Sequence, residues 1–168
     1  MSNIIILNAA ARKNGNTTAL VKAFTEGAKE SGHTVKEFYL QTMTIRGCVA
    51  CMGCTRNADP CTQRDEMTQI YNEFKTCDVV VFSSPVYFLG VAGPLKTCVD
   101  RLFAVFAKYG YDECHRKSAL LMTSDDPQYE QAVDWYHMFT ENVGWDNLGE
   151  VLGSGRTKEA HDLGASVE

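Results

Sequence analysis

The segment DVVVFSSPVYFLGVAGPLKTCVDRL, residues 78–102, holds the strongest signal for the fold. It opens with a run of β-branched and aromatic residues, which is typical of a strand buried on both faces of a parallel sheet. We expect this strand to end at the break formed by Ser83, Ser84 and Pro85. Pro94 then begins a stretch with apolar residues at helical spacing, which predicts a helix over 93–107. A buried strand that leads into a helix is the repeating unit of an α/β fold.

The same alternation runs along the whole chain. Strands are predicted over 3–8, over 33–40, from 78 to the Ser-Ser-Pro break, over 117–124 and over 145–155, and helices over 17–32, 64–77, 93–107, 127–144 and 157–167. This order predicts one domain over residues 1–168, an α/β doubly wound five-stranded parallel sheet with helices on both faces and the flavodoxin-like strand order 2-1-3-4-5. In this fold the ligand lies beyond the carboxyl ends of the strands. The loops after Asn8, Ser84 and Ser124 are therefore expected to meet at one site.

Composition narrows the classes of function. The chain has 168 residues, of which 45% are hydrophobic and 22% charged, and its net charge is −5. It has no basic run interleaved with aromatic residues, so we expect no nucleic-acid partner. Its apolar runs are too short to span a membrane, and its first residues lack the pattern of a secretory signal. We therefore expect a cytoplasmic protein, in which the seven cysteines do not imply a disulfide framework.

The loop after the first strand reads ARKNGNTTAL, residues 11–20, and is a candidate phosphate site. Arg12 supplies a positive charge, while Asn16, Thr17 and Thr18 place polar side chains at a helix N-terminus, where free N–H groups bind anions. The loop matches neither a Walker motif nor G-x-G-x-x-G, so the phosphate of a mononucleotide fits better than ATP or NAD. The alternative is an ordinary helix start with Asn16 or Thr17 as N-cap.

Four cysteines gather between residues 46 and 64. Cys48, Cys51, Cys54 and Cys61 follow the spacing C-x2-C-x2-C-x6-C, which is more compact than the paired knuckles of most structural zinc sites and favours an iron–sulfur cluster. A disulfide, a zinc site and reduced thiols stay open as alternatives. The other three cysteines, Cys77, Cys98 and Cys114, are expected to be small core residues.

Two stretches resemble the flavodoxin-like NAD(P)H-dependent FMN reductases. AARKNGNT (10–17) is similar to their first flavin loop from Arg12 onward, and SSPVYFLGVAGPLKTCVDRL (83–102) is similar to their second. The resemblance implies that FMN is held by the phosphate loop, by the ring-binding residues Pro85, Val86, Tyr87 and Phe88, and by a third loop at Ser124. The chain departs from the family pattern at Ala10, Leu89 and Asp125–Asp126, and we expect these two aspartates to cap the next helix.

The four-cysteine loop resembles that of the iron–sulfur flavoproteins, in which a [4Fe–4S] cluster exchanges electrons with FMN. The resemblance implies an FMN-dependent oxidoreductase that uses NAD(P)H, with Cys48, Cys51, Cys54 and Cys61 holding the cluster and no catalytic side chain. It further implies small electron acceptors or a ferredoxin as partners, and a homodimer or tetramer. Two alternatives stay open. One is an electron-transfer protein without turnover of its own, and the other is a degenerate binding or redox-sensing module without FMN.

Overall fold

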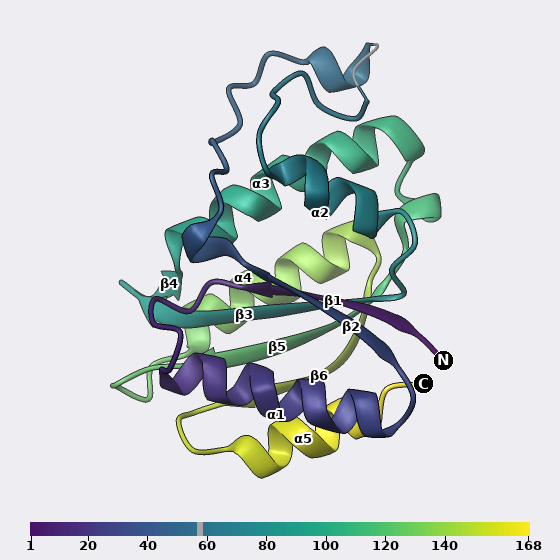
Figure 1. Ribbon diagram of the computed structural model, residues 1–168. Coiled ribbons are helices and arrows are strands. Elements are labelled where there is room, and N and C mark those ends of the chain that lie inside the picture. Colours follow the sequence, from purple (N-terminus) through teal and green to yellow (C-terminus); the bar gives the residue numbers. More distant parts are fainter. Residues whose placement is uncertain (57–58) are drawn as a thin grey trace.

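The computed structural model describes residues 1–56 and 59–168 and has a parallel sheet between two layers of helices (Figure 1). The strands are β1 (Asn3–Asn8), β2 (Thr34–Tyr39), β3 (Val79–Tyr87), β4 (Gly90–Val91), β5 (Lys117–Thr123) and β6 (Asp146–Leu152). The helices are α1 (Asn16–Glu30), α2 (Met67–Phe74), α3 (Gly93–Tyr109), α4 (Glu130–Val143) and α5 (Thr157–Ala165). Each predicted strand and helix is therefore present.

The five long strands are parallel and lie in the order β2-β1-β3-β5-β6. This is the predicted order 2-1-3-4-5, with the short strand β4 left out of the count. Strand β4 pairs with the end of β3 in an antiparallel hairpin that the sequence analysis did not predict. The flavodoxin-like doubly wound architecture is thus confirmed.

The predicted end of β3 at Ser-Ser-Pro is wrong. The strand continues to Tyr87, and Pro85 still pairs with Thr123 of β5. The N–H of Ala9 donates to the Ser83 carbonyl (2.8 Å), so the backbone groups of Ser83 face β1. Pro85, two residues on, faces the same side, but the pairing with β1 has already ended there. The missing N–H of proline therefore removes no ladder hydrogen bond.

Three helix starts also differ from the prediction, and one of them is that of α2, which begins at Met67 where the sequence predicts residue 64. Helix α1 begins at Asn16 with Gly15 as N-cap, so neither Asn16 nor Thr17 is the cap. Helix α4 begins at Glu130 after Tyr129, so Asp125 and Asp126 do not cap it. The reason lies in a contact across the loop, because the Tyr129 hydroxyl accepts a hydrogen bond from the Ser124 N–H (3.0 Å). This contact stabilises a turn between β5 and α4 that delays the helix.

The core has one part on each face of the sheet. Helices α1 and α5 pack on one face, and α2, α3 and α4 cover the other (Figure 1). Cys77, Cys98 and Cys114 are buried, as predicted for core residues. Within the described residues, no helix is both long and apolar enough to cross a membrane.

Candidate flavin site

One cavity lies at the carboxyl ends of the central strands, where the sequence predicts the site. The loops after β1 and β5 meet the last residues of β3 there, close to the arrangement expected, and the loop after β6 joins them. The lining residues are Ala10, Ala11, Arg12, Gly15, Asn16, Thr17, Pro85, Val86, Tyr87, Thr123, Ser124, Asp125 and Ser154. In a doubly wound sheet, the reversal of strand order between β1 and β3 creates a crevice for a ligand at this edge.

Polar contacts fix the backbone of the loop between β1 and α1. Asn8 is fully buried, its Oδ1 accepts a hydrogen bond from the Ala10 N–H (2.9 Å), and its Nδ2 donates to Glu37 (2.7 Å). The carbonyl of Arg12 accepts the Gly15 N–H (3.2 Å) and the Thr18 hydroxyl (3.0 Å). These contacts position the Arg12 backbone beside the first turn of α1.

The first turn of α1 has the features of an anion site. Gly15, the N-cap, offers no side-chain hydrogen bond to the turn, and the turn holds no acidic residue. Its N–H groups therefore have no partner within the helix, and the helix dipole favours negative charge there. Arg12, Gly15, Asn16 and Thr17 all line the cavity at this point. The residues present thus fit a phosphate group.

Two side-chain contacts connect this turn to the rest of the cavity. The hydroxyls of Thr17 and Thr123 lie 2.6 Å apart, and Asn16 Nδ2 donates to the Ser154 hydroxyl (3.0 Å). The sequence analysis missed Thr123, Ser154 and the supporting Asn8. Thr123 could have been found, because it is the last residue of a central strand and strand ends form this kind of site. Ser154 gave no such signal.

The β3–β4 hairpin forms another wall of the cavity and has an unusual turn. Phe88 and Leu89, its two central residues, have φ angles of +48° and +65°. Two-residue hairpins normally place Asn-Gly or a similar pair at such angles, because bulky residues are strained there. Phe88 is fully exposed, and Tyr87 is half exposed. Strain combined with exposed aromatic rings is characteristic of a functional segment.

The third loop brings a negative charge to the cavity. Ser124 and Asp125 both line the cavity, and both lie in the turn that precedes α4. Asp126 is not among the lining residues. Arg12 and Asp125 therefore give one cavity a cationic and an anionic side chain.

The structure brings most, but not all, of the predicted flavin residues together. Seven of them line the cavity: Arg12, Asn16, Thr17, Pro85, Val86, Tyr87 and Ser124. Thr18 instead donates its hydroxyl to the Arg12 carbonyl and so supports the loop from outside the cavity. Phe88 lies at the exposed hairpin tip beyond the lining residues. Direct contact of these two side chains with a ligand stays a prediction.

The four-cysteine loop lies over α3, away from the sheet (Figure 1). Its predicted span, 46–64, includes residues 57–58, which lie outside the described residues. Cys48, Cys51, Cys54 and Cys61 all line one small cavity together with Gln63 and Arg101. Cys61 is buried, whereas Cys48 and Cys51 are exposed, and all seven cysteines are free.

The thiols of this loop are not arranged around one point. Over residues 1–56 and 59–168, no three His, Cys, Asp or Glu side chains are placed to hold a single metal ion. A cubane cluster differs, because each thiolate bonds a separate iron and the sulfurs need only surround a common cavity. The Thr62 hydroxyl, 3.2 Å from the Cys51 sulfur, lowers the pKa of that thiol, and the Gly53 backbone adds to this effect. The four cysteines therefore share one cavity, and within residues 1–56 and 59–168 they form no site for a single ion.

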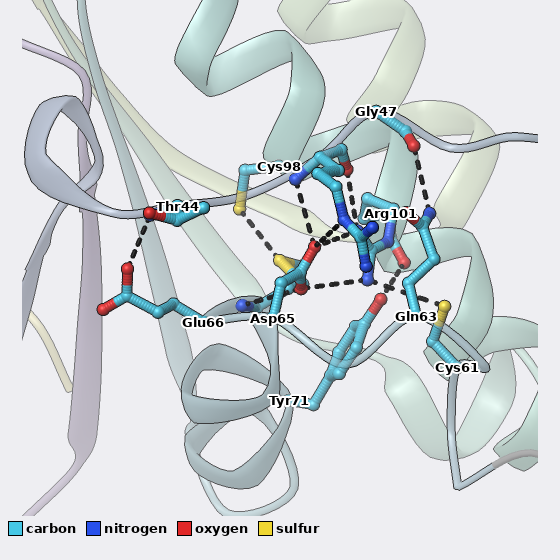
Figure 2. A network of polar contacts seen from close by, with 11 residues as sticks. Thr44, Gly47, Cys61, Gln63, Asp65, Glu66, Tyr71, Cys98 and Arg101 are labelled. Carbon is cyan, nitrogen blue, oxygen red and sulfur yellow. Dashed lines mark hydrogen bonds and ion pairs between the residues drawn. The ribbon is translucent and has the colours of Figure 1, made fainter.

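Arg101 of α3 lies beside these cysteines and is almost fully buried (Figure 2). Its Nη1 is 2.9 Å from Asp65 Oδ2 and its Nη2 is 3.3 Å from Asp65 Oδ1. Burial raises the pKa of Asp65, but the hydrogen bond and charge of Arg101, together with the N–H groups of Arg46 and Met67, hold that pKa below its ordinary value. Asp65 Oδ1 also accepts the Met67 N–H (3.2 Å), so Asp65 supports the start of α2, although the N-cap of that helix is Glu66.

Comparison with known proteins identifies the family. Residues 2–149 match the model of the NADPH-dependent FMN reductase family. Because this match covers most of the sequence, the chain belongs to that family. The predicted family resemblance is therefore confirmed.

Curated relatives include several iron–sulfur flavoproteins. One from Archaeoglobus fulgidus is 32% identical over 91 residues, which cover 54% of this chain and 41% of that protein. One from Methanocaldococcus jannaschii is 35% identical over 80 residues, covering 48% of this chain and 40% of that protein. The chain thus spans less than half the length of these relatives.

A solved structure supports the fold over the full length. The NAD(P)H:quinone oxidoreductase of Methanothermobacter marburgensis superposes with a TM-score of 0.73 at 18% identity, covering 99% of each chain. At this identity the likeness concerns the fold alone. Together with the family match, it establishes a flavodoxin-like member of an oxidoreductase family.

Proposed function

We propose that the chain binds FMN in the cavity at the carboxyl ends of β1, β3 and β5 and acts as an NAD(P)H-dependent oxidoreductase. The observation that carries this proposal is the meeting of three predicted flavin loops in one cavity, in a member of the NADPH-dependent FMN reductase family. Within residues 1–56 and 59–168, no other cavity combines an open helix N-terminus with the family's two flavin motifs.

The phosphate would be bound by the first turn of α1. Its free N–H groups, the Arg12 guanidinium and the hydroxyl of Thr17 supply donors for a dianion. Ala10, where the chain departs from the family pattern, has no hydroxyl to offer, but its N–H is held by Asn8 and the residue still lines the cavity. The N–H groups of the first turn, the Arg12 guanidinium and the Thr17 hydroxyl are the types of donor that bind the phosphate of a mononucleotide.

The flavin ring would lie against the hairpin. Pro85, Val86 and Tyr87 give an apolar and aromatic wall that excludes water from one side of the ring. FMN, when bound, supplies the redox chemistry by accepting a hydride and passing electrons on. Asp125 would repel negative charge on the reduced ring and so favour the oxidised form. No side chain needs to act as acid or base.

The four-cysteine loop would hold a [4Fe–4S] cluster through Cys48, Cys51, Cys54 and Cys61. Support comes from their shared cavity, from the C-x2-C-x2-C-x6-C spacing and from relatives named iron–sulfur flavoproteins. Such a cluster transfers single electrons, so a ferredoxin or another small carrier is the kind of acceptor we expect. We also expect a homodimer or tetramer.

Binding of FMN and of riboflavin to the flavin-free protein tests the proposal. We expect quenching of flavin fluorescence by both ligands, with tighter binding of FMN because only FMN has a phosphate. NADPH and NADH are then supplied with a quinone, and oxidation of either supports the enzymatic function. Failure to bind FMN at all would contradict the proposal and favour the degenerate module.

A second candidate function follows from the cysteine loop. If the protein is an electron-transfer protein, reduced ferredoxin should reduce its flavin quickly while NAD(P)H does so slowly. Stopped-flow measurement of flavin absorbance with each donor separates the two functions. Fast reduction by NAD(P)H supports the enzyme, and fast reduction by ferredoxin alone supports the carrier.

A further inference from the structure

Both arms of the four-cysteine loop meet at the Arg101–Asp65 ion pair (Figure 2). The incoming arm is bound through Arg46, whose carbonyl accepts from Arg101 Nη1 (2.7 Å) and whose N–H donates to Asp65 Oδ2 (3.0 Å). The outgoing arm contains Asp65 itself. One buried pair therefore fixes residues that lie 19 positions apart in the sequence.

Further hydrogen bonds join the same two arms. Gln63 Nε2 donates to the Gly47 carbonyl (3.0 Å). Thr44 and Glu66 are joined twice, by the Thr44 N–H to the Glu66 carboxylate (2.6 Å) and by the Glu66 N–H to the Thr44 carbonyl (3.2 Å). The two ends of the segment that contains Cys48, Cys51 and Cys54 are thus held together by hydrogen bonds.

The guanidinium also faces sulfur. Its Nη2 lies 3.5 Å from the Cys61 sulfur and can donate a hydrogen bond to it. Its Nε–H is buried and finds no acceptor among residues 1–56 and 59–168. Arg101 lines the cavity that the four cysteines share. A buried donor without an acceptor is costly, and a ligand with an acceptor atom within reach of Nε would offset that cost.

We propose that Arg101 is the positioning residue of the four-cysteine loop: its guanidinium, held by Asp65, preorders both arms of the loop and donates hydrogen bonds to the Cys61 sulfur and to the cluster. The preordering of the loop stands on the contacts alone, whereas the part that concerns the cluster rests on the proposed function. Donors and positive charge near a cluster stabilise its reduced, more negative state. Arg101 therefore raises the reduction potential of the cluster.

Two different variants test this role, so that the test still holds if one of them fails to fold. Arg101→Lys keeps the buried charge but loses the planar fork that binds Asp65, Arg46 and Cys61 together. Arg101→Met combined with Asp65→Asn removes both charges, so no unpaired charge is left buried. Lys108→Ala is the matched control, because Lys108 also lies on α3 and pairs with Asp59 of the same loop, but at the surface (2.7 Å).

The first readout is amide hydrogen exchange of peptides covering residues 43–48 and 62–67 in iron-free protein. We expect exchange about tenfold faster in both Arg101 variants, since hydrogen bonds to charged groups are lost, and unchanged exchange in Lys108→Ala. Exchange in helix α1 serves as the internal control for folding. Unchanged exchange in both Arg101 variants would overturn the proposal, whether or not the protein binds iron.

The second readout is the midpoint potential and iron content of anaerobically reconstituted protein. We expect a lower potential in Arg101→Lys and less iron in the double variant, with FMN content and Lys108→Ala as in the wild type. Equal potential and iron content in all variants would overturn the cluster part of the proposal. If the wild type takes up no iron, the proposed cluster fails and the exchange measurement alone decides the role of Arg101.

Discussion

Replacement of Arg12 by alanine is expected to weaken the binding of FMN while leaving the binding of riboflavin nearly unchanged. Arg12 is the one Lys or Arg side chain among the described residues that line the flavin cavity. It lies beside Gly15 at the first turn of α1, where the phosphate would bind. Riboflavin has no phosphate, so it reports on the ring site alone.

The size of the effect follows from the exposure of Arg12. A hydrogen bond to a charged group contributes about 1.5–3 kcal/mol, and solvent screening at an exposed side chain places this one near the lower end. A loss of about 1.5 kcal/mol corresponds to roughly tenfold weaker binding of FMN. Lys13→Ala is the matched control, because Lys13 has the same charge next along the chain but lies over the Tyr39 ring and does not line the cavity.

Fluorescence titration of the flavin-free wild type and both variants with FMN and riboflavin, at low and high salt, gives the affinities needed. We expect the loss for FMN in Arg12→Ala to shrink as salt increases, and Lys13→Ala to bind both flavins nearly as the wild type does. Equal weakening of FMN and riboflavin by Arg12→Ala would show that the side chain supports the loop and does not bind the phosphate. Equal effects of the two variants would show that only the overall charge matters.

Three further predictions concern stability. Because Phe88 is exposed and has a positive φ, Phe88→Asn should have a free energy of unfolding about 1 kcal/mol higher than Phe88→Ala in urea, and equal values would contradict the strained turn. The pKa of Asp65 is lowered by Arg101. The ionised carboxylate therefore stabilises the fold fully above the unfolded pKa of about 4, and this stabilisation is lost as pH falls through the lower folded pKa. The free energy of unfolding, measured at several acid pH values, should decrease with falling pH in the wild type and decrease less in Asp65→Asn. At Gly27 an added Cβ would lie 2.1 Å from the His161 carbonyl oxygen, so Gly27→Ala should lower the free energy of unfolding by about 1–3 kcal/mol, and an unchanged melting temperature would contradict the close packing of α1 on α5.

The fold could be predicted because its signals are local. Runs such as VVVF in β3 and the helical spacing of α3 follow from residues close in the sequence, and the strand order follows from the alternation of strands and helices. The predicted ends that were wrong depend on distant partners. Pro85 stays in β3 because β1 has ended beside it, and α4 starts late because Tyr129 bonds to Ser124.

In the candidate site too, local motifs and topology could be predicted, whereas contacts between distant residues could not. Its place at the carboxyl ends of the strands follows from topology, and the residues of the first two loops follow from motifs. Ser154 arrives from the loop after β6, which no motif marks. The role of Arg101 could not be predicted either, because its partners Asp65 and Arg46 lie 36 and 55 positions away and meet it only in the folded chain.

The content of FMN, iron and acid-labile sulfide per chain, measured after purification without oxygen, tests the central claim most directly. We predict FMN together with about four irons and four sulfides per chain. FMN without iron would retain the flavin oxidoreductase but contradict the cluster. A protein that contains neither cofactor, and takes up neither on reconstitution, would contradict the account.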